Sequence, residues 1–264
     1  MRALVRAKAV LILHTIRLWR YRWSFLNMIL AEAAWVFLFI LGALLFIPKE
    51  FLGVAVKGAF WIIVAWSVIS NFSGLIGGWM NFFISIGMVE EHMLRGFSPF
   101  KALIGRLIPG SAVTVASLFF MGALVGGAFR VDVFAVEDVP LLLLGMILLV
   151  VKGLSYGFTV ASIAVRTSVP QNLLEILNFG FIGLMMVPLS SVPEKARLLY
   201  LAIPYIAPTH LLKVATSSAP KMLVYEAMAI SSVESVIMLF LAITSMKLVN
   251  SWILRNGVRA IGFW

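Results

Sequence analysis

The chain has 264 residues, of which 62% are hydrophobic and only 12% are charged. A soluble domain is about half apolar and a quarter charged. This composition therefore excludes an ordinary soluble protein and predicts an integral membrane protein. The absence of cysteine excludes disulfides, thiolate metal sites and cysteine nucleophiles. The net charge of +10 comes from basic residues that flank apolar runs, which favours the lipid bilayer as a partner and predicts no nucleic acid.

Residues 1–24 are predicted to form a basic amphipathic helix that lies on the inner leaflet of the membrane. On a helix, the arginines of this segment share one face, and its leucines and isoleucines face away. These basic residues are Arg2, Arg6, Arg17 and Arg20. The alternative is a positively charged tail that only sets the membrane topology.

Six stretches of the chain are long and apolar enough to cross a membrane, since an apolar helix needs about 20 residues to do so. They lie at approximately residues 25–47, 58–88, 107–129, 140–165, 173–192 and 227–248. The second stretch is long enough to tilt or to contain a break near Ser73–Gly78. We therefore expect an all-α integral membrane protein in which residues 25–264 form a single transmembrane domain with six transmembrane helices.

The distribution of basic residues predicts the orientation. Six crossings would place both ends of the chain on one side of the membrane. The segments on that side carry more lysine and arginine than the segments on the other side, which predicts cytoplasmic N- and C-termini. The expected location is the cell membrane, with multiple passes.

Glycine pairs with the GxxxG spacing occur in the second, third and fourth predicted spans: Gly74–Gly78, Gly122–Gly126 and Gly153–Gly157. This spacing allows two helix backbones to approach closely. Packing within the chain is the favoured interpretation, and a seam between two copies is the alternative.

Ionisable residues inside predicted spans are candidates for a translocation pathway or a buried ion pair: Lys152, Glu175 and Glu234. Charges inside a membrane are costly and normally face the interior of the bundle. Glu32 and Glu175 lie near the cytoplasmic ends of their spans, where interfacial solvation is a sufficient explanation. Lys152 lies near the middle of its span, so we expect it to have a partner. An ion pair with a glutamate and a role in substrate passage both remain open.

The connection between the second and third spans, residues 89–106, reads VEEHMLRGFSPFKALIGR and faces the cytoplasm on the predicted topology. Glu90, Glu91 and Arg95 would solvate a short amphipathic helix whose apolar side chains pack inward, and Gly96 and Pro99 permit a bend within it. Such a segment is either an inert connection or a docking element for a cytosolic partner. The pattern alone does not separate these two.

Enzyme motifs are mostly missing. The sequence contains no GxxxxGK[ST] and no HExxH, and we predict no catalytic, cofactor-binding or metal-binding residues and no enzymatic activity. Glu90–Arg95 spells EExxxR, which resembles the first motif of the glutamate-dependent intramembrane CAAX-type proteases. Those proteases also require histidines on later membrane helices, and His210 is the only histidine after Arg95.

The order of these elements resembles the permease subunit of ABC-2 type (type V) exporters along essentially the whole chain. The matching parts are the amphipathic N-terminal helix, the six spans, a cytoplasmic helix between spans two and three, and a proline-rich exit from the fifth span. That exit reads MMVPLSSVPEKARLLYLAIPYIAPTHLLKVA and contains Pro188, Pro193, Pro204 and Pro208.

The resemblance implies a membrane subunit that moves a substrate outward, driven by ATP hydrolysis on a separate cytosolic ATP-binding cassette subunit. Residues 89–106 would contain the coupling helix seated on that partner, and the proline-rich exit would be a re-entrant segment. ATP and Mg would bind the partner, with no cofactor in this chain, and two permeases would form a homodimer or heterodimer. The alternatives are a secondary transporter or channel subunit and, with less support, a glutamate intramembrane protease that uses the EExxxR of Glu90–Arg95. The residues assigned to partner coupling are Glu90, Glu91, Arg95, Phe97, Ser98 and Pro99.

Overall fold

The structure is a computed structural model that describes residues 8–9, 12–13, 15–16, 19–44, 48, 52–167, 171–217 and 222–257. Much of the amphipathic helix predicted for residues 1–24, including Arg2, Arg6 and Arg17, lies outside the described residues, as does the side chain of Glu32.

The described part of the chain is helical and contains no strand. Its elements are, in chain order, α2 (Arg22–Leu44), α3 (Leu52–Phe72), the π-helix η2 (Ser73–Gly78), α4 (Trp79–Ser85), α5 (Met88–Leu94), α6 (Pro99–Phe129), α7 (Val139–Arg166), α8 (Gln171–Met186), the 3₁₀ turns η3 (Leu189–Ser191) and η4 (Glu194–Ala196), α9 (Arg197–Leu201), α10 (Ile206–Thr216) and α11 (Val224–Asn256). The prediction of an all-α protein is confirmed.

Five of these helices are long and apolar enough to cross a membrane: α2, the continuous helix Leu52–Ser85, α6, α7 and α11. The protein is therefore a multi-pass membrane protein. The fifth predicted span, residues 173–192, is shorter in the structure, since α8 has 16 residues and a length of about 24 Å at 1.5 Å per residue. Pro188 explains this early end, because proline lacks the N–H that continues a helix and disfavours helical backbone in the residue before it.

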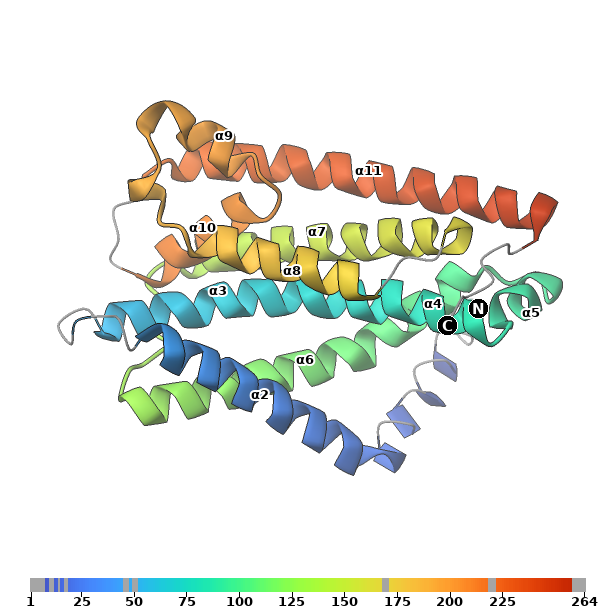
Figure 1. Cartoon of the computed structure of the whole chain (residues 1–264), viewed down its shortest axis with the longest axis horizontal. Coiled ribbons are helices and arrows are strands. Elements are labelled where there is room, and N and C mark those ends of the chain that lie inside the picture. Colours follow the sequence, from blue (N-terminus) through green and yellow to red (C-terminus); the bar gives the residue numbers. More distant parts are fainter. Residues whose placement is uncertain are drawn as a thin grey trace.

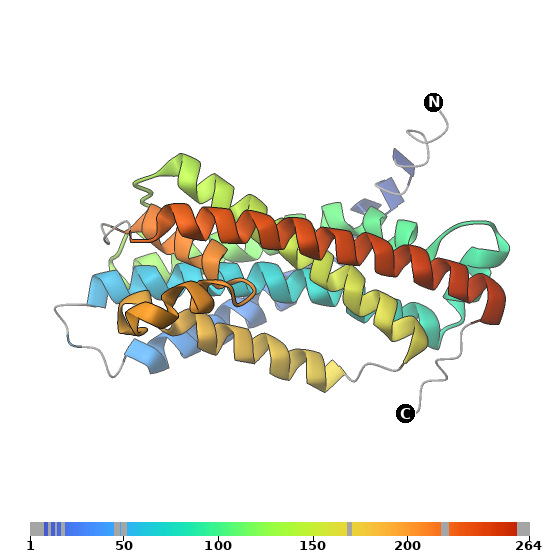
Figure 2. The ribbon, with the colours of Figure 1, turned by 90° about the horizontal axis from the view of Figure 1, so that it is seen from above.

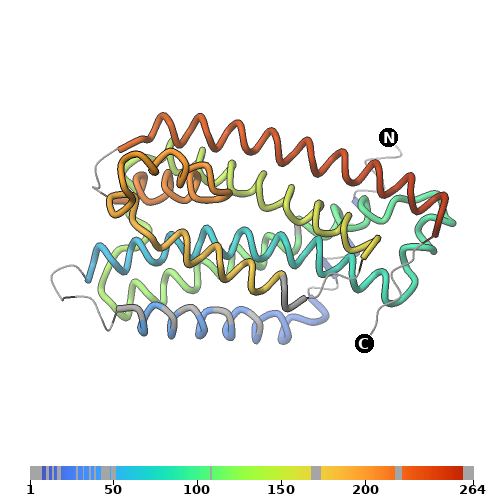
Figure 3. The backbone as a smooth tube through the Cα atoms, turned by 45° about the horizontal axis from the view of Figure 1, so that its top comes forward, coloured from blue at the N-terminus to red at the C-terminus, as the bar shows by residue number. Residues whose placement is uncertain are grey.

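The bundle has two distinct ends (Figures 1 and 2). We call them the α5 end, where α5 lies and α7 and α11 finish, and the α9 end, where α9 and α10 lie and α3, α7 and α11 begin. Helices α3, α7 and α11 run toward the α5 end, whereas α2, α6 and α8 run toward the α9 end, as the tube in Figure 3 lets the reader follow.

Helix α7 lies at the centre of the packing and contacts α11, η2, α10 and α3. The core has two parts. The larger cluster fills the space between α3, α7 and α10 and includes Phe60, Leu149 and Leu211. The smaller cluster lies toward the α5 end and joins the residues around η2 to α5, α6, α7 and α11.

The predicted irregularity near Ser73–Gly78 is present as the π-helix η2. Here α7 comes close enough that only glycine fits at position 157, since a Cβ there would lie 2.6 Å from the carbonyl oxygen of Phe72. A Cβ at Gly77 would lie 2.7 Å from Cγ1 of Val160. The Gly153–Gly157 pair is therefore used for packing within the chain, as predicted, whereas a Cβ at Gly74 would meet nothing within 4 Å.

Replacing Gly157 with alanine is expected to lower the stability of the bundle by about 1–3 kcal/mol, because the added methyl group forces α7 away from the backbone of α3. The measurement is thermal unfolding of the purified chain in a neutral detergent. Gly74→Ala is the matched control, because its Cβ enters open space. An equal effect of the two substitutions would contradict the close approach of α7.

Candidate functional site

Helix α5 and the turn after it replace the single bent helix predicted for residues 89–106. Gly96 adopts a left-handed backbone conformation with φ +67°, and the chain turns there after the end of α5. Glycine suits this conformation because it has no Cβ. Ser98 is extended, and Pro99 occupies the first turn of α6. Proline has no N–H, but the N–H groups of a first turn make no hydrogen bond within the helix, so none is lost. Residues 99–106 therefore form the beginning of α6, and the predicted bend separates two helices.

The outward face of α5 is exposed and charged. Nη2 of Arg95 donates to Oε1 of Glu91 at 2.5 Å, one helical turn apart, and both side chains are exposed. Leu94, beside this pair, is 88% exposed. An isolated surface pair of this kind contributes little to stability, so the charged face is available for contact with another molecule.

The inward face of α5 is packed against the bundle. Val89 is fully buried together with Phe83, Phe100 and Leu103. His92 contacts the rings of Phe83 and Phe97, with centroid distances of 5.5 and 5.9 Å.

Burial lowers the pKa of His92, and the positive charge of Arg95 lowers it further against the opposing effect of Glu91. Burial therefore favours the neutral form of the imidazole. Phe97 also donates its backbone N–H to the carbonyl oxygen of His92 at 2.8 Å. Helix α5 is thus seated firmly, with Glu91, Leu94 and Arg95 facing outward.

The EExxxR motif and the later histidine lie far apart in this structure. Glu91 pairs with Arg95 inside the motif, and Oε2 of Glu90 is buried without a hydrogen-bond partner in the described part of the protein. His210, the only later histidine, lies on α10 at the opposite end of the bundle (Figure 1). The described residues contain no group of three or more His, Cys, Asp or Glu side chains placed to hold a metal ion.

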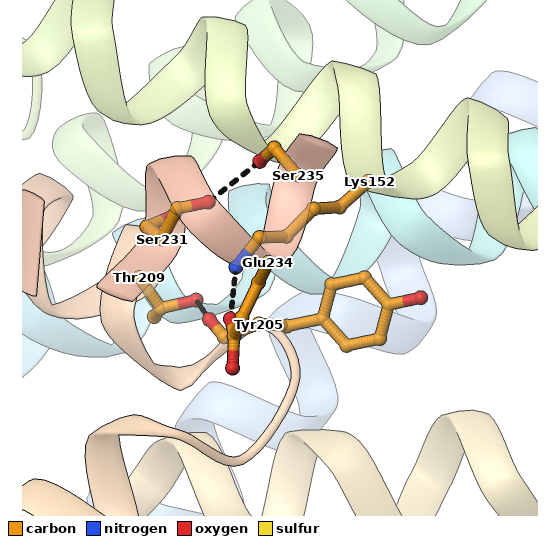
Figure 4. A network of polar contacts seen from close by, with 6 residues as sticks. All are labelled: Lys152, Tyr205, Thr209, Ser231, Glu234 and Ser235. Carbon is orange, nitrogen blue, oxygen red and sulfur yellow. Dashed lines mark hydrogen bonds and ion pairs between the residues drawn. The ribbon is translucent and has the colours of Figure 1, made fainter. Parts of the chain in front are cut away.

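Lys152 and Glu234 form an ion pair in the interior of the bundle (Figure 4). Nζ of Lys152 donates to Oε2 of Glu234. Lys152 is fully buried on α7, and the Glu234 side chain on α11 is 18% exposed. Glu175 lies elsewhere, exposed in the first half of α8. Of the two roles left open for Lys152, the structure contains the ion pair, and a role in substrate passage stays a prediction.

Further polar side chains surround this ion pair (Figure 4). Tyr205 and Ser231 are almost completely buried, and their hydroxyl groups have no hydrogen-bond partner among the described residues. Thr209 and Ser235 each donate to a backbone carbonyl one turn earlier, at 2.7 Å. Sequence reasoning missed these residues, although the spacing of Ser231, Glu234 and Ser235 places them on one face of α11.

The four prolines predicted for a re-entrant segment each lie between helical segments or at the start of one. Pro188 and Pro193 directly precede the 3₁₀ turns η3 and η4. Pro204 lies in the turn between α9 and α10, and Pro208 lies in the first turn of α10. The helical segments Glu194–Leu201 and Ile206–Thr216 meet at an angle of 106°.

The second arm of this bend returns into the protein. Leu211 and Leu212 of α10 are fully buried, and α10 contacts α3, α7 and α11. The turn depends on Tyr205, whose φ of +74° is left-handed. Its ring packs against Phe181 and Tyr156, at centroid distances of 4.9 and 6.2 Å. This packing offsets the cost of a conformation that bulky residues rarely adopt.

A comparison with models of known protein families gives no match, and a comparison with curated proteins finds no similar sequence. The function is therefore argued from the geometry of α5, the buried ion pair and the bent proline-rich segment.

Replacing Lys152 with methionine is expected to lower the stability by about 3–5 kcal/mol, because the carboxylate of Glu234 loses its counter-charge inside the bundle. The double variant Lys152→Met with Glu234→Gln should recover most of this loss, since neither charge remains. Thermal unfolding of the unaltered chain, the two single variants and the double variant gives the stabilities for a double-mutant cycle. Additive losses would show that the two side chains do not interact.

Proposed function

We propose that this chain is the membrane-spanning permease subunit of an ATP-binding cassette exporter. In this role it transfers the motion of a separate ATP-hydrolysing subunit to a path for substrate through the membrane. The observation that carries the proposal is α5: a short helix, packed on its inner face and charged on its outer face, between two long apolar helices. The order of the remaining elements, which resembles that of ABC-2 type permeases along the whole chain, also supports the proposal.

The packing under α5 gives a route for force. Val89 of α5 belongs to the same buried cluster as Ile76 of η2, Phe158 of α7 and Val249 of α11. A load on α5 therefore acts on three long helices at once rather than on a loose connection. It also reaches the π-helix η2, a helix type found often at functional sites. These contacts support a coupling role for Glu90, Glu91, Arg95 and the turn that follows.

The directions of the helices support six crossings. Helices α7 and α11 both run from the α9 end to the α5 end (Figure 3). The chain between them must return to the α9 end, and α8 makes that return. If α7 and α11 each cross the bilayer, the segment that contains α8 crosses it as well, even though α8 alone is short. The bent segment after it then returns into the bundle from the α9 end, as a re-entrant segment does.

The charges support an orientation with the α5 end in the cytoplasm. Lys101, Arg106, Arg166 and Arg255 lie on helices at that end, as the positive-inside rule expects. With the α5 end inside, α5 is accessible to a cytosolic subunit that carries ATP and Mg. A dimer of permeases would complete the transporter.

A secondary transporter or channel is the second candidate. The observation in its favour is the buried pair of Lys152 and Glu234, because ionisable residues inside a membrane often mark an ion or substrate pathway. Transport by the purified chain in liposomes, without any ATP-binding subunit, would support this candidate over the exporter.

The substitution Leu94→Asp is expected to abolish co-purification with an ATP-binding subunit, such as one encoded beside this chain in the genome. Leu94 is 88% exposed on α5, so the change leaves the core intact and places a charge in the middle of the proposed contact. Leu199→Asp is the matched control, since Leu199 is 75% exposed on α9 at the other end. The exporter proposal fails if the unaltered chain associates with no ATP-binding subunit.

Reversing the charges of Glu91 and Arg95 one at a time should uncouple ATP hydrolysis from transport while membrane insertion stays normal. Each single reversal replaces the pair with two like charges one turn apart, which repel each other and present a different face to the partner. The double exchange Glu91→Arg with Arg95→Glu restores the internal pair. ATPase rate and transport rate are measured together in the reconstituted complex. Transport that stays proportional to ATPase in the single reversals would contradict coupling through this face.

A further inference from the structure

A cavity of about 530 Å³ lies at the α9 end, between the start of α3, the end of α8 and α10. Its walls are mainly apolar and include Val54, Ile62, Met185, Leu201 and Val214. This volume falls in the range of small-molecule sites, which are typically apolar with a few fixed polar groups. The helix ends that line it lie at the end of the bundle opposite α5, as the labels in Figure 1 show.

Most polar side chains that line this cavity are already engaged with the protein. Thr209 donates to the carbonyl oxygen of Tyr205, and Nε2 of His210 lies 2.9 Å from the carbonyl oxygen of Met222. The hydroxyl of Tyr200 donates to the carbonyl oxygen of Leu184 in the last turn of α8 and also lies 3.1 Å from that of Val187. These groups shape the cavity but have little capacity left for a ligand.

Lys213 differs from its neighbours. Its Nζ donates to the carbonyl oxygen of Met185 at 2.5 Å, and an ammonium group has three N–H donors. No carboxylate in the described ranges pairs with it, and the described residues that line the cavity include neither aspartate nor glutamate. The side chain is partly buried. An ammonium in apolar surroundings is costly without a counter-charge, so the cavity favours a ligand that brings a negative charge.

We propose that this cavity binds an amphiphile with one anionic head group, a carboxylate or a phosphate, whose head pairs with Lys213 and whose alkyl chain lies along the apolar walls formed by α3 and α8. The head would complete the hydrogen bonds of the ammonium, and the chain would fill space that water solvates poorly. The site does not depend on the proposed transport function, because binding is a property of the chain alone.

The test measures binding of tetradecanoate and tetradecyl phosphate to the full chain in a neutral detergent, by native mass spectrometry. One bound molecule per chain is expected, with an affinity at least tenfold above that of the uncharged tetradecanol. Inorganic phosphate is the probe that separates an amphiphile from a free anion, and it should bind weakly. Equal binding of tetradecanol and tetradecanoate, or binding of inorganic phosphate as tight as that of tetradecyl phosphate, would overturn the proposal.

Substitutions at Lys213 and Gly58 test separately the contacts of the protein with the head group and with the alkyl chain of the ligand. Lys213→Gln should lower tetradecanoate affinity at least tenfold and leave tetradecanol binding unchanged, whereas Lys213→Arg should retain the preference for the acid. Gly58→Leu should weaken both ligands, because Gly58 lines the cavity and a Cβ there meets nothing within 4 Å. Lys195→Gln, an exposed lysine at the same end, is the control. Unchanged tetradecanoate binding in Lys213→Gln would contradict the site.

Discussion

The ion pair between Lys152 and Glu234 determines how the centre of this bundle is organised. A lysine in the middle of an apolar helix needs a counter-charge, and the partner is 82 residues away on the last helix. The pairing holds α11 beside α7 in the same direction. Tyr205 and Thr209 at the start of α10 close over the pair (Figure 4). The proline-rich segment that leads into α10 cannot form one continuous helix, and these contacts give it a fixed place in the interior.

Much of the fold follows from local patterns in the sequence. Apolar length predicts α2, α6, α7 and α11 to within a few residues at most ends, because crossing a bilayer imposes a length that composition reveals. Glycine spacing predicts the approach of α7 at Gly157. The length of the second span predicted either a tilt or a break near Ser73–Gly78, where η2 lies, although the sequence does not say which helix type forms there.

Other features depend on contacts that a single sequence does not contain. The glutamate that pairs with Lys152 was left open, because helix faces become neighbours only in the assembled bundle. Residues 89–106 were predicted as one bent helix, since Gly96 and Pro99 are compatible both with a bend and with an end followed by a new start. The cavity beside Lys213 was not predicted at all, because its walls come from three segments that only the bend at Tyr205 brings together.

The spacing of charged residues along the long helices can be compared with the thickness of a bilayer. In α11, Lys247 follows Glu226 by 21 positions, or about 32 Å at 1.5 Å per residue, which matches a hydrocarbon layer of about 30 Å. The remaining residues to Asn256 continue past that layer at the α5 end. In α6, the turns from Pro99 to Arg106 do the same. If the bilayer covers these helices between their charged ends, α5 lies beyond the lipid tails, and a protein that binds it does not have to enter the hydrocarbon.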